Sequence, residues 1–162
     1  VGRQYLVEAY EENPDSDVTE VIPYYDLDQD QTISAAAFMG SKEEANKQTE
    51  EYEQRRLDVA GLSNEGEVVA AVEAERVNHD VKRAVPDDFD KIAECGVEDA
   101  IWIVMTQSAG HDVLAALNEP TDGTPRVEKT YAKTTPPQQF RIDSPGLSAM
   151  YPVEWLRDRL ED

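Results

Sequence analysis

The spacing of apolar residues alternates along the chain between the period of a helix and the period of a strand, which predicts a mixed α/β architecture. Residues 2–13 carry apolar side chains at helical spacing and predict a short amphipathic helix. Residues 18–27 are rich in β-branched and aromatic side chains and predict a strand, although Pro23 restricts it to a sheet edge or a bulge. Two further apolar runs, 56–63 and 67–77, flank a short glycine-containing turn and predict a β-hairpin.

The second half of the chain continues this alternation of helices and strands. Pro86 near a helix start and Gly96 as a helix stop predict a helix over 85–96. Residues 99–106 predict a third core strand, and 110–120 predict a further helix that ends before a proline. The order helix, strand, hairpin strands, helix, strand, helix fits a mixed sheet with helices on both faces.

Composition changes after residue 120. Residues 121–162 contain paired prolines and several glycines, and only 152–160 have the apolar spacing of a short helix. We therefore expect residues 1–120 to form the α/β core and 121–162 to form an extended C-terminal appendage with a short terminal helix. The apolar side of that helix would pack on the main body or on a partner subunit.

The charge balance is strongly acidic, with 35 Asp and Glu residues against 15 Lys and Arg residues and a formal net charge of -20. Hydrophobic residues make up 40% of the chain, which is enough for a folded core. Acid spread over the whole length is typical of proteins from a high-salt cytoplasm, where the Debye length falls to roughly 3 Å and self-repulsion is screened. We therefore expect a cytoplasmic protein from a halophilic source, whose acidity does not by itself exclude DNA as a partner.

Cysteine content and hydropathy exclude two further classes of protein. Cys95 is the only cysteine, so neither an internal disulfide nor a cysteine-based zinc cluster can form. No apolar run approaches the roughly 18 residues of a membrane helix, and no membrane partner is expected.

The charged run 41–56 is expected to be a solvated surface. A homo-oligomer, or a place in a larger parent assembly, is compatible with these features.

One stretch resembles a calcium-binding loop but departs from it at two positions. Asp26, Asp28 and Asp30 occupy the first, third and fifth places of such a loop. The sixth place, where the sharp turn needs glycine, holds Gln31, and the twelfth, where a bidentate glutamate closes the shell, holds Ala37. A solvated acidic loop is therefore favoured over a calcium site.

A second group of acids gives a stronger candidate site. Side chains alternate along a strand, so Glu73 and Glu75 project from the same face at the end of the second hairpin strand. Asp58 on the preceding strand would lie across from them. Three oxygen donors so close favour Mg²⁺ or Mn²⁺, which could activate a water against a phosphodiester. Alternatively, the two glutamates only make one face of the sheet polar and solvent-exposed, and they pair with nearby basic side chains.

The order of these acids and elements resembles the PD-(D/E)xK restriction-endonuclease-like superfamily. There, an acid ends one strand, the next strand of the hairpin finishes in acid-x-acid or acid-x-Lys, and a helix and an apolar strand follow. The matching segments here are "RLDV" with Asp58, "AVEAE" with Glu73 and Glu75, the helix "PDDFDKIAEC" and the strand "AIWIVMT". The resemblance covers residues 1–118 and extends to uncharacterised haloarchaeal proteins of plasmids, viruses and DNA-transfer machinery.

The resemblance implies a nuclease-like domain of a halophilic archaeon that binds or cleaves DNA, encoded within a mobile element. In an active enzyme Asp58, Glu73 and Glu75 would hold Mg²⁺ or Mn²⁺ as ligands and take part in catalysis. Glu8 corresponds to an extra acid that some members use. The alternative is a catalytically inactive module that keeps the fold and serves in DNA docking or assembly of a larger protein.

The sequence departs from the family pattern at one position. Glu75 stands where members usually have a lysine, which orients the attacking water and stabilises charge at phosphorus. We expect Lys82, or else Arg83, to reach back from the following helix as the displaced cation.

A DNA partner also requires some positive surface. Residues 126–142 carry a local excess of basic residues with aromatic residues between them, which is a pattern that suits nucleic-acid contact. The candidate DNA-binding residues are Arg126, Lys129, Lys133 and Arg141. Structural packing of Tyr131 and Phe140 is the alternative use of the aromatic residues.

Overall fold

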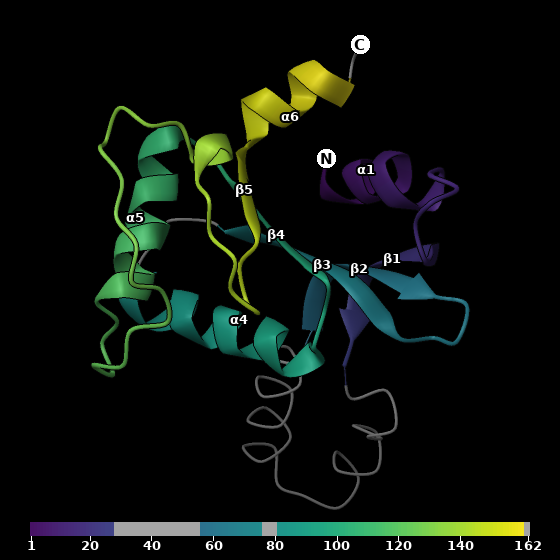
Figure 1. Cartoon of the computed structure of the whole chain (residues 1–162), viewed down its shortest axis with the longest axis horizontal. Helices are drawn as coiled ribbons and strands as arrows, with labels where there is room; N and C mark the ends of the chain where they lie inside the picture. The colour runs from purple at the N-terminus through teal and green to yellow at the C-terminus, as the bar shows by residue number, and fades with distance from the viewer. Residues whose placement is uncertain (28–55, 76–80, 161–162) are drawn as a thin grey trace, which may run out of the picture.

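The computed structural model describes residues 1–27, 56–75 and 81–160. Its centre is a five-stranded sheet in which the strands lie side by side in chain order (Figure 1). These strands are β1 (Val18–Asp26), β2 (Arg56–Ser63), β3 (Val68–Glu75), β4 (Asp99–Val104) and β5 (Ala149–Pro152). The pairs β1–β2 and β2–β3 are antiparallel, whereas β3–β4 and β4–β5 are parallel, so the sheet is mixed.

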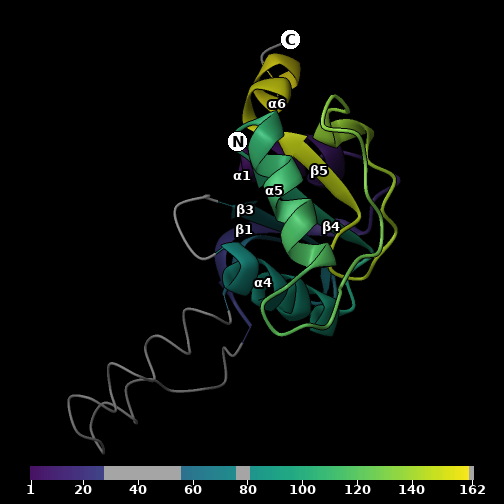
Figure 2. The same ribbon diagram turned by 90° about the vertical axis from the view of Figure 1, so that its left-hand side faces the viewer.

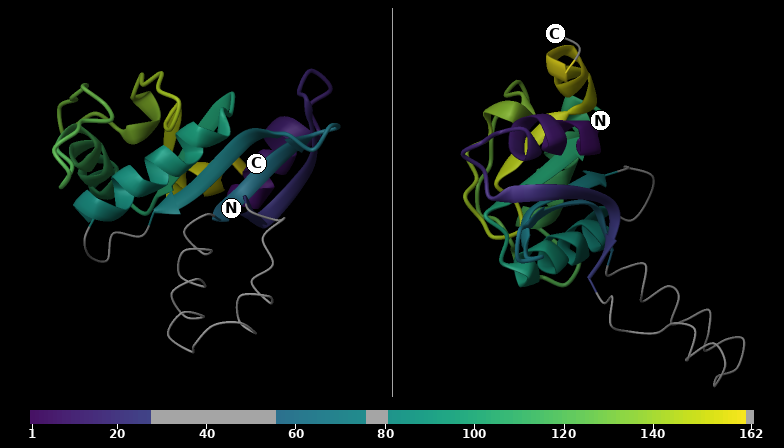
Figure 3. Two further views of the ribbon diagram at one scale, coloured as in Figure 1. Left: turned by 90° about the horizontal axis from the view of Figure 1, so that it is seen from below. Right: turned by 90° about the vertical axis from the view of Figure 1, so that its right-hand side faces the viewer.

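Helices cover both faces of this sheet. They are α1 (Gly2–Leu6), α4 (Val81–Cys95), α5 (Gln107–Asn118) and α6 (Val153–Leu160), with a π-helical turn at Val7–Glu11 and a 3-10 turn at Pro137–Gln139. Helices α4 and α5 pack on one face, and α1 and α6 pack on the other (Figures 1 and 2). Seen from the side, β1 runs between α1 and α4 (Figure 3). The predicted α/β sheet with helices on both faces is confirmed.

The predicted hairpin and edge strand are both present. Strands β2 and β3 form the hairpin, and Gly66 in its turn has a φ of 80°, a conformation that glycine adopts without strain. Strand β1 lies at one edge of the sheet, where Pro23 need not donate to a second neighbour.

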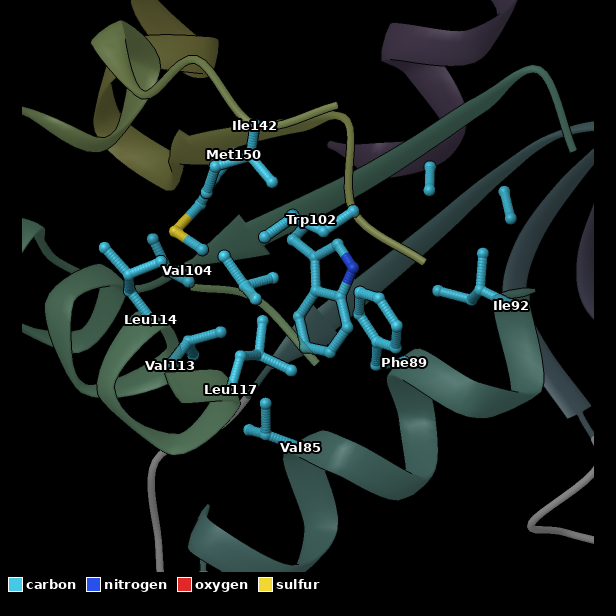
Figure 4. Close-up of a cluster of buried hydrophobic side chains, with 14 of the residues drawn as sticks. Val85, Phe89, Ile92, Trp102, Val104, Val113, Leu114, Leu117, Ile142 and Met150 are labelled. Atoms are coloured by element: carbon cyan, nitrogen blue, oxygen red, sulfur yellow. The ribbon is translucent and has the colours of Figure 1, made fainter. Parts of the chain in front are cut away.

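The larger hydrophobic core lies between the sheet and the pair α4 and α5 (Figure 4). Its centre is the fully buried Trp102 of β4, whose indole Nε1 donates to the carbonyl oxygen of Gly146 at 2.7 Å. Phe89 of α4 packs beside that indole (Figure 4). A smaller cluster on the opposite face joins Leu6 of α1 and Leu156 of α6 to the sheet.

Residues 121–160 do not form the extended appendage that their composition predicted. Strand β5 pairs with β4 as the fifth strand of the sheet. The segment also buries apolar side chains in the larger core, namely Val127, Phe140, Ile142, Leu147 and Met150. Irregular, proline-rich backbone therefore completes the core, because it carries buried apolar residues between its turns. The expected terminal helix is present as α6.

Helix α4 begins at Val81, five residues before the proline that was expected to mark its start. Pro86 lies inside the helix and has no N–H to donate to the carbonyl one turn earlier. That carbonyl, of Lys82, instead accepts from the backbone N–H of Thr121 at 3.2 Å. The 121–160 segment thus satisfies the acceptor that the proline leaves open.

Two sequence expectations fall partly or wholly outside the described residues. Asp28 and Asp30 of the calcium-like loop lie there, as does most of the charged run 41–56. Within the described residues, no helix is both long and apolar enough to span a membrane.

Packing at Gly146 gives a first prediction. A methyl group there would lie 2.5 Å from the backbone oxygen of Phe89 and 2.6 Å from its ring. We expect Gly146→Ala to lower the free energy of unfolding by about 1–3 kcal/mol, because two well-packed segments must separate. Urea denaturation in molar KCl measures this, with the exposed Asp143→Ala as control. Equal midpoints for Gly146→Ala and wild type would contradict the packing described.

Candidate active site

The two glutamates of β3 both face α4. In the parallel pairing of β3 with β4, Glu73 lies next to Trp102 and Glu75 lies next to Val104. Both β4 residues belong to the core beneath α4 and α5. The alternation of side chains along β3 thus places both carboxyl groups on one face, as predicted. Their chain positions are at the C-terminal end of a strand that has a parallel neighbour, which is where open α/β sheets bind ligands.

The side chain of Asp58 is hydrogen-bonded to the same end of β3. The backbone pairing of β2 with β3 ends at Val59 and Val72. Beyond that point, Asp58 Oδ2 accepts from the backbone N–H of Ala74 at 2.8 Å. The side chain of Asp58 therefore replaces a strand-to-strand hydrogen bond and lies beside the two glutamates.

Two residues of α4 complete the cluster, and neither was predicted from the sequence. Lys91 Nζ lies 2.7 Å from Glu73 Oε1 and 3.4 Å from Asp88 Oδ1, and it donates to the carbonyl of Arg56 at 2.8 Å. The contact with Glu73 is a close ion pair whose angles fall outside those of an aligned hydrogen bond. The available signal was the spacing of Asp88 and Lys91, which stand one helical turn apart beside the buried stripe of α4.

All the buried charged side chains of the described residues belong to this cluster. Glu73 is 4% exposed, Glu75 8% and Lys91 8%, and these are the charged side chains that the described residues bury. Burying a charge is costly unless a partner compensates it. The buried charges must therefore be compensated, either by other side chains of the cluster or by a bound ligand of opposite charge.

Burial dominates the protonation of the carboxyl groups. Burial raises the pKa of Glu73 well above its ordinary value, against the opposing charge of Lys91. Burial, then the charge of Asp88 and a hydrogen bond with it, raise the pKa of Glu75 to about 8. Burial also raises the pKa of Asp88. Asp58 contributes by charge, since its carboxylate further raises the pKa of each of these three groups.

Lys91 remains protonated in this setting. Burial alone would lower its pKa, but the carboxylates of Glu73 and Asp88 outweigh that effect and raise it. At neutral pH, Glu75 is mainly protonated and shares its proton with Asp88, while Lys91 balances a further charge. A proton and a lysine thus provide the compensation that the acids need.

A cleft of about 1350 Å³ opens over these groups. Its acidic lining is Asp58, Glu73, Glu75 and Asp88, with Lys91 among them. The rest of the lining comes from Val1 and α1, from strands β1 to β4, from the turn between β4 and α5, and from α5 and α6. The cleft therefore passes around the end of β3 and reaches elements on both faces of the sheet.

The chemistry of the donors suits a hard divalent cation. Carboxylate oxygens are the ligands that Mg²⁺ and Mn²⁺ prefer, and Asp58, Glu73 and Glu75 supply them, with Asp88 as a further donor. Within residues 1–27, 56–75 and 81–160, however, no three Asp, Glu, His or Cys side chains are arranged to hold a metal ion as they stand. Metal binding would require the carboxyl groups to turn toward one another.

Other predicted catalytic residues lie away from the cleft. Lys82 is in the first turn of α4, is exposed, and is not among the cleft-lining residues; nor is its neighbour Arg83. The cation that α4 brings to the acids is Lys91, two and a half turns further along the helix. Glu8 accepts from the side-chain amide of Gln4 at 3.0 Å on the surface and does not line the cleft either.

The four candidate DNA-binding residues do not form one open basic face. Arg126 is bound between Asp90 and Asp122, at 2.8 and 2.6 Å, and its side chain is 12% exposed. Lys129 donates to the backbone oxygen of Arg141. Lys133 and Arg141 are exposed. The neighbouring rings of Tyr131 and Phe140 stack on each other with centroids 4.7 Å apart, so they serve packing.

Comparison of the chain with protein-family models, curated proteins and solved structures found no match.

The ion pair of Lys91 gives a second prediction. Lys91→Met removes the cation beside Glu73, whose buried carboxyl group must then keep an uncompensated charge or take up a proton, so we expect a loss of about 3–5 kcal/mol in the free energy of unfolding at neutral pH. Adding Glu73→Gln should recover much of that loss, because the uncompensated charge disappears. Urea denaturation in molar KCl measures both variants, with the exposed Lys82→Met as matched control. A Lys91→Met protein as stable as wild type would contradict the role assigned to this pair.

The raised pKa of Glu75 gives a third prediction. The folded protein binds a proton at Glu75 that the unfolded chain releases between its ordinary pKa of 4.5 and about 8. Stability therefore falls as pH rises across this window, and the raised pKa values of Glu73 and Asp88 act in the same direction. We expect Glu75→Gln to reduce that slope, measured by melting temperature across the window. The exposed Glu154→Gln should leave the slope unchanged, and equal slopes in all three proteins would exclude this titration.

Proposed function

We propose that this chain is a nuclease-like domain that binds DNA and hydrolyses its phosphodiester bonds with Mg²⁺ or Mn²⁺. The proposal includes the restriction-endonuclease-like fold, whose expected order of helix, hairpin strands, helix and parallel strand agrees with the arrangement of α1, β1 to β3, α4 and β4. The net charge of -20 supports a high-salt cytoplasm in a halophilic archaeon as its setting.

The observation that carries the proposal is the position of Lys91. The family that the sequence resembles combines acids with a lysine, and Glu75 stands at the strand position where that lysine is expected. Lys91 reaches the same cluster from α4 and lies 2.7 Å from Glu73. A cation moved from the strand to the facing helix would supply the same charge beside the acids. Lys91 therefore replaces Lys82 as the proposed cation.

Each side chain then has a chemical task. Asp58, Glu73 and Glu75 would hold the metal ion, which supplies Lewis-acid stabilisation of charge on the phosphate and lowers the pKa of a bound water. Lys91, fixed by the carbonyl of Arg56, would orient that water and stabilise the negative charge that develops at phosphorus. Asp58 also keeps the end of β3 in place through the N–H of Ala74.

A second candidate is an inactive module that keeps the fold and docks DNA or assembles within a larger protein. It is favoured by the way in which the acids are already neutralised. Glu75 shares a proton with Asp88, and Lys91 pairs with Glu73, so the described cluster balances much of its charge without a metal. In this candidate, the buried charges specify the docking of α4 on the sheet instead of supporting catalysis.

Cleavage assays separate the two candidates and give a fourth prediction. Plasmid and single-stranded DNA are incubated with the protein in molar KCl and Mn²⁺. Wild type should cleave, and Glu73→Ala and Asp58→Asn should each slow cleavage about a hundredfold or more. Asp58→Asn is a matched change because its amide oxygen can still accept from Ala74 while the charge is lost. Glu8→Gln, outside the cleft, should cleave like wild type.

The outcomes are distinct. Cleavage that continues at the wild-type rate in Glu73→Ala and Asp58→Asn would remove the proposed site. No cleavage by any variant, together with retention of DNA in a gel-shift assay, would favour the inactive module.

A further inference from the structure

Two exposed apolar side chains stand on the rim of the acidic cleft. Tyr24 is 71% exposed and Met105 57%, and they are two of the three large hydrophobic side chains that are exposed among the described residues. Both line the cleft that contains the acids. Exposed apolar side chains scattered singly need no explanation, whereas two on the rim of one charged cleft point to a ligand with apolar surface.

Their positions in the sheet place the acids between them. Pro23 pairs with Val59 and Tyr25 pairs with Leu57, so Tyr24 lies between these pairs, level with Asp58 of β2. Met105 directly follows β4, whose last residue pairs with Glu75. Neighbouring strands are about 4.8 Å apart, so Tyr24 and Met105 stand roughly 14 Å apart across the strand ends that carry the acids. A ligand that touches both residues crosses the strand ends that carry the acids.

The backbone of Tyr24 is strained. Its φ is 54°, and among the described residues it is the one non-glycine residue with a positive φ. The left-handed region is unfavourable for a bulky side chain and persists only when its surroundings impose it. Here the strained residue is an exposed aromatic residue of the edge strand β1, and it lines the candidate site.

Two arginines line the same cleft from the other face of the sheet. Arg3 of α1 and Arg157 of α6 are both exposed. Neither guanidinium makes a hydrogen bond or an ion pair with any other described residue. Arg126, in contrast, forms ion pairs with Asp90 and Asp122. In a chain with a net charge of -20, unpaired guanidinium groups on a cleft wall complement a ligand that carries phosphates.

We propose that the cleft takes a single strand of DNA, with unpaired bases stacked on Tyr24 and Met105 and phosphates held by Arg3 and Arg157. This inference rests on the proposed function for its choice of DNA. Bases inside a duplex are stacked on each other and are closed to a protein side chain, whereas those of a single strand are open to aromatic stacking. Stacking also persists in concentrated salt, where phosphate contacts lose most of their contribution. The strand would cross from β1 to β4 over the acids.

Binding assays without divalent metal test this inference separately from cleavage. Labelled oligothymidylate and a hairpin duplex are titrated with the full chain in EDTA and KCl, followed by fluorescence anisotropy. We expect the single strand to bind more tightly than the duplex. Tyr24→Asn should weaken single-strand binding about tenfold or more, because one stacked base is lost, while Tyr24→Phe should bind like wild type. Asparagine tolerates a positive φ, so this change spares the backbone.

A matched pair of arginine variants locates the path of the strand. Arg157→Ala should weaken binding and reduce the salt dependence of log Kd by about 0.7, the value for one lost phosphate contact on a single strand. Arg159→Ala, which removes another exposed arginine of α6 that does not line the cleft, should change neither quantity. Met105→Gln should also weaken binding and gives a second test if Tyr24→Asn lowers the urea midpoint.

Three results would overturn the inference: equal or tighter binding of the duplex, wild-type affinity in both Tyr24→Asn and Met105→Gln, or an effect of Arg159→Ala in place of Arg157→Ala. Tyr24-dependent binding without any cleavage would support this inference and overturn the catalytic proposal. Cleavage that depends on Glu73 but not on Tyr24 would do the reverse.

Discussion

The burial of Glu73 among other carboxyl groups is the constraint on which the site depends. A side chain that is 4% exposed cannot keep a charge without a partner, and Lys91 is the partner that the described residues provide at 2.7 Å. Since Lys91 also donates to the carbonyl of Arg56, it connects α4 to both hairpin strands. The position of α4 on the sheet is therefore fixed by one buried ion pair as well as by the apolar residues around Trp102. An ion pair in such a place specifies one arrangement because other registers of the helix would leave a charge uncompensated.

Those parts of the fold that local patterns encode were predictable from the sequence. The hairpin followed from two apolar runs and Gly66, and the shared face of Glu73 and Glu75 followed from the two-residue period of a strand. Lys91 and Asp88 were missed because their contact with β3 depends on how a helix docks, which no local pattern states. Nearby Lys82 and Arg83 were expected instead because they come sooner in the chain after β3. Strand β5 was missed because it has only four residues, one of them proline, within a segment rich in turn signals.

Charge counted along a sequence differs from charge presented on a surface. The local excess of basic residues over 126–142 predicted a DNA-binding region, but Arg126 is bound by two aspartates and holds this segment against α4 through Asp90. In the cleft the relation is reversed. Arg3 and Arg157 are isolated in the sequence and far apart along it, yet α1 and α6 pack on the same face and bring both into one lining. Tertiary packing, and not local composition, therefore decides which cations can meet a phosphate.

The end of β3 suits a binding site because two strands separate there while the N–H of Ala74 keeps a hydrogen-bond partner. Past Val72, the N–H of Ala74 donates to the carboxylate of Asp58 in place of a carbonyl of β2, so this donor stays paired where the cleft opens. On the other side, β4 stays paired through Glu75 and keeps the acids in register. Asp58 thus has two effects: it ends the hairpin pairing and it adds negative charge beside Glu73. An asparagine at this position would retain the first effect and lose the second, which makes the geometric and electrostatic contributions of this acid separable.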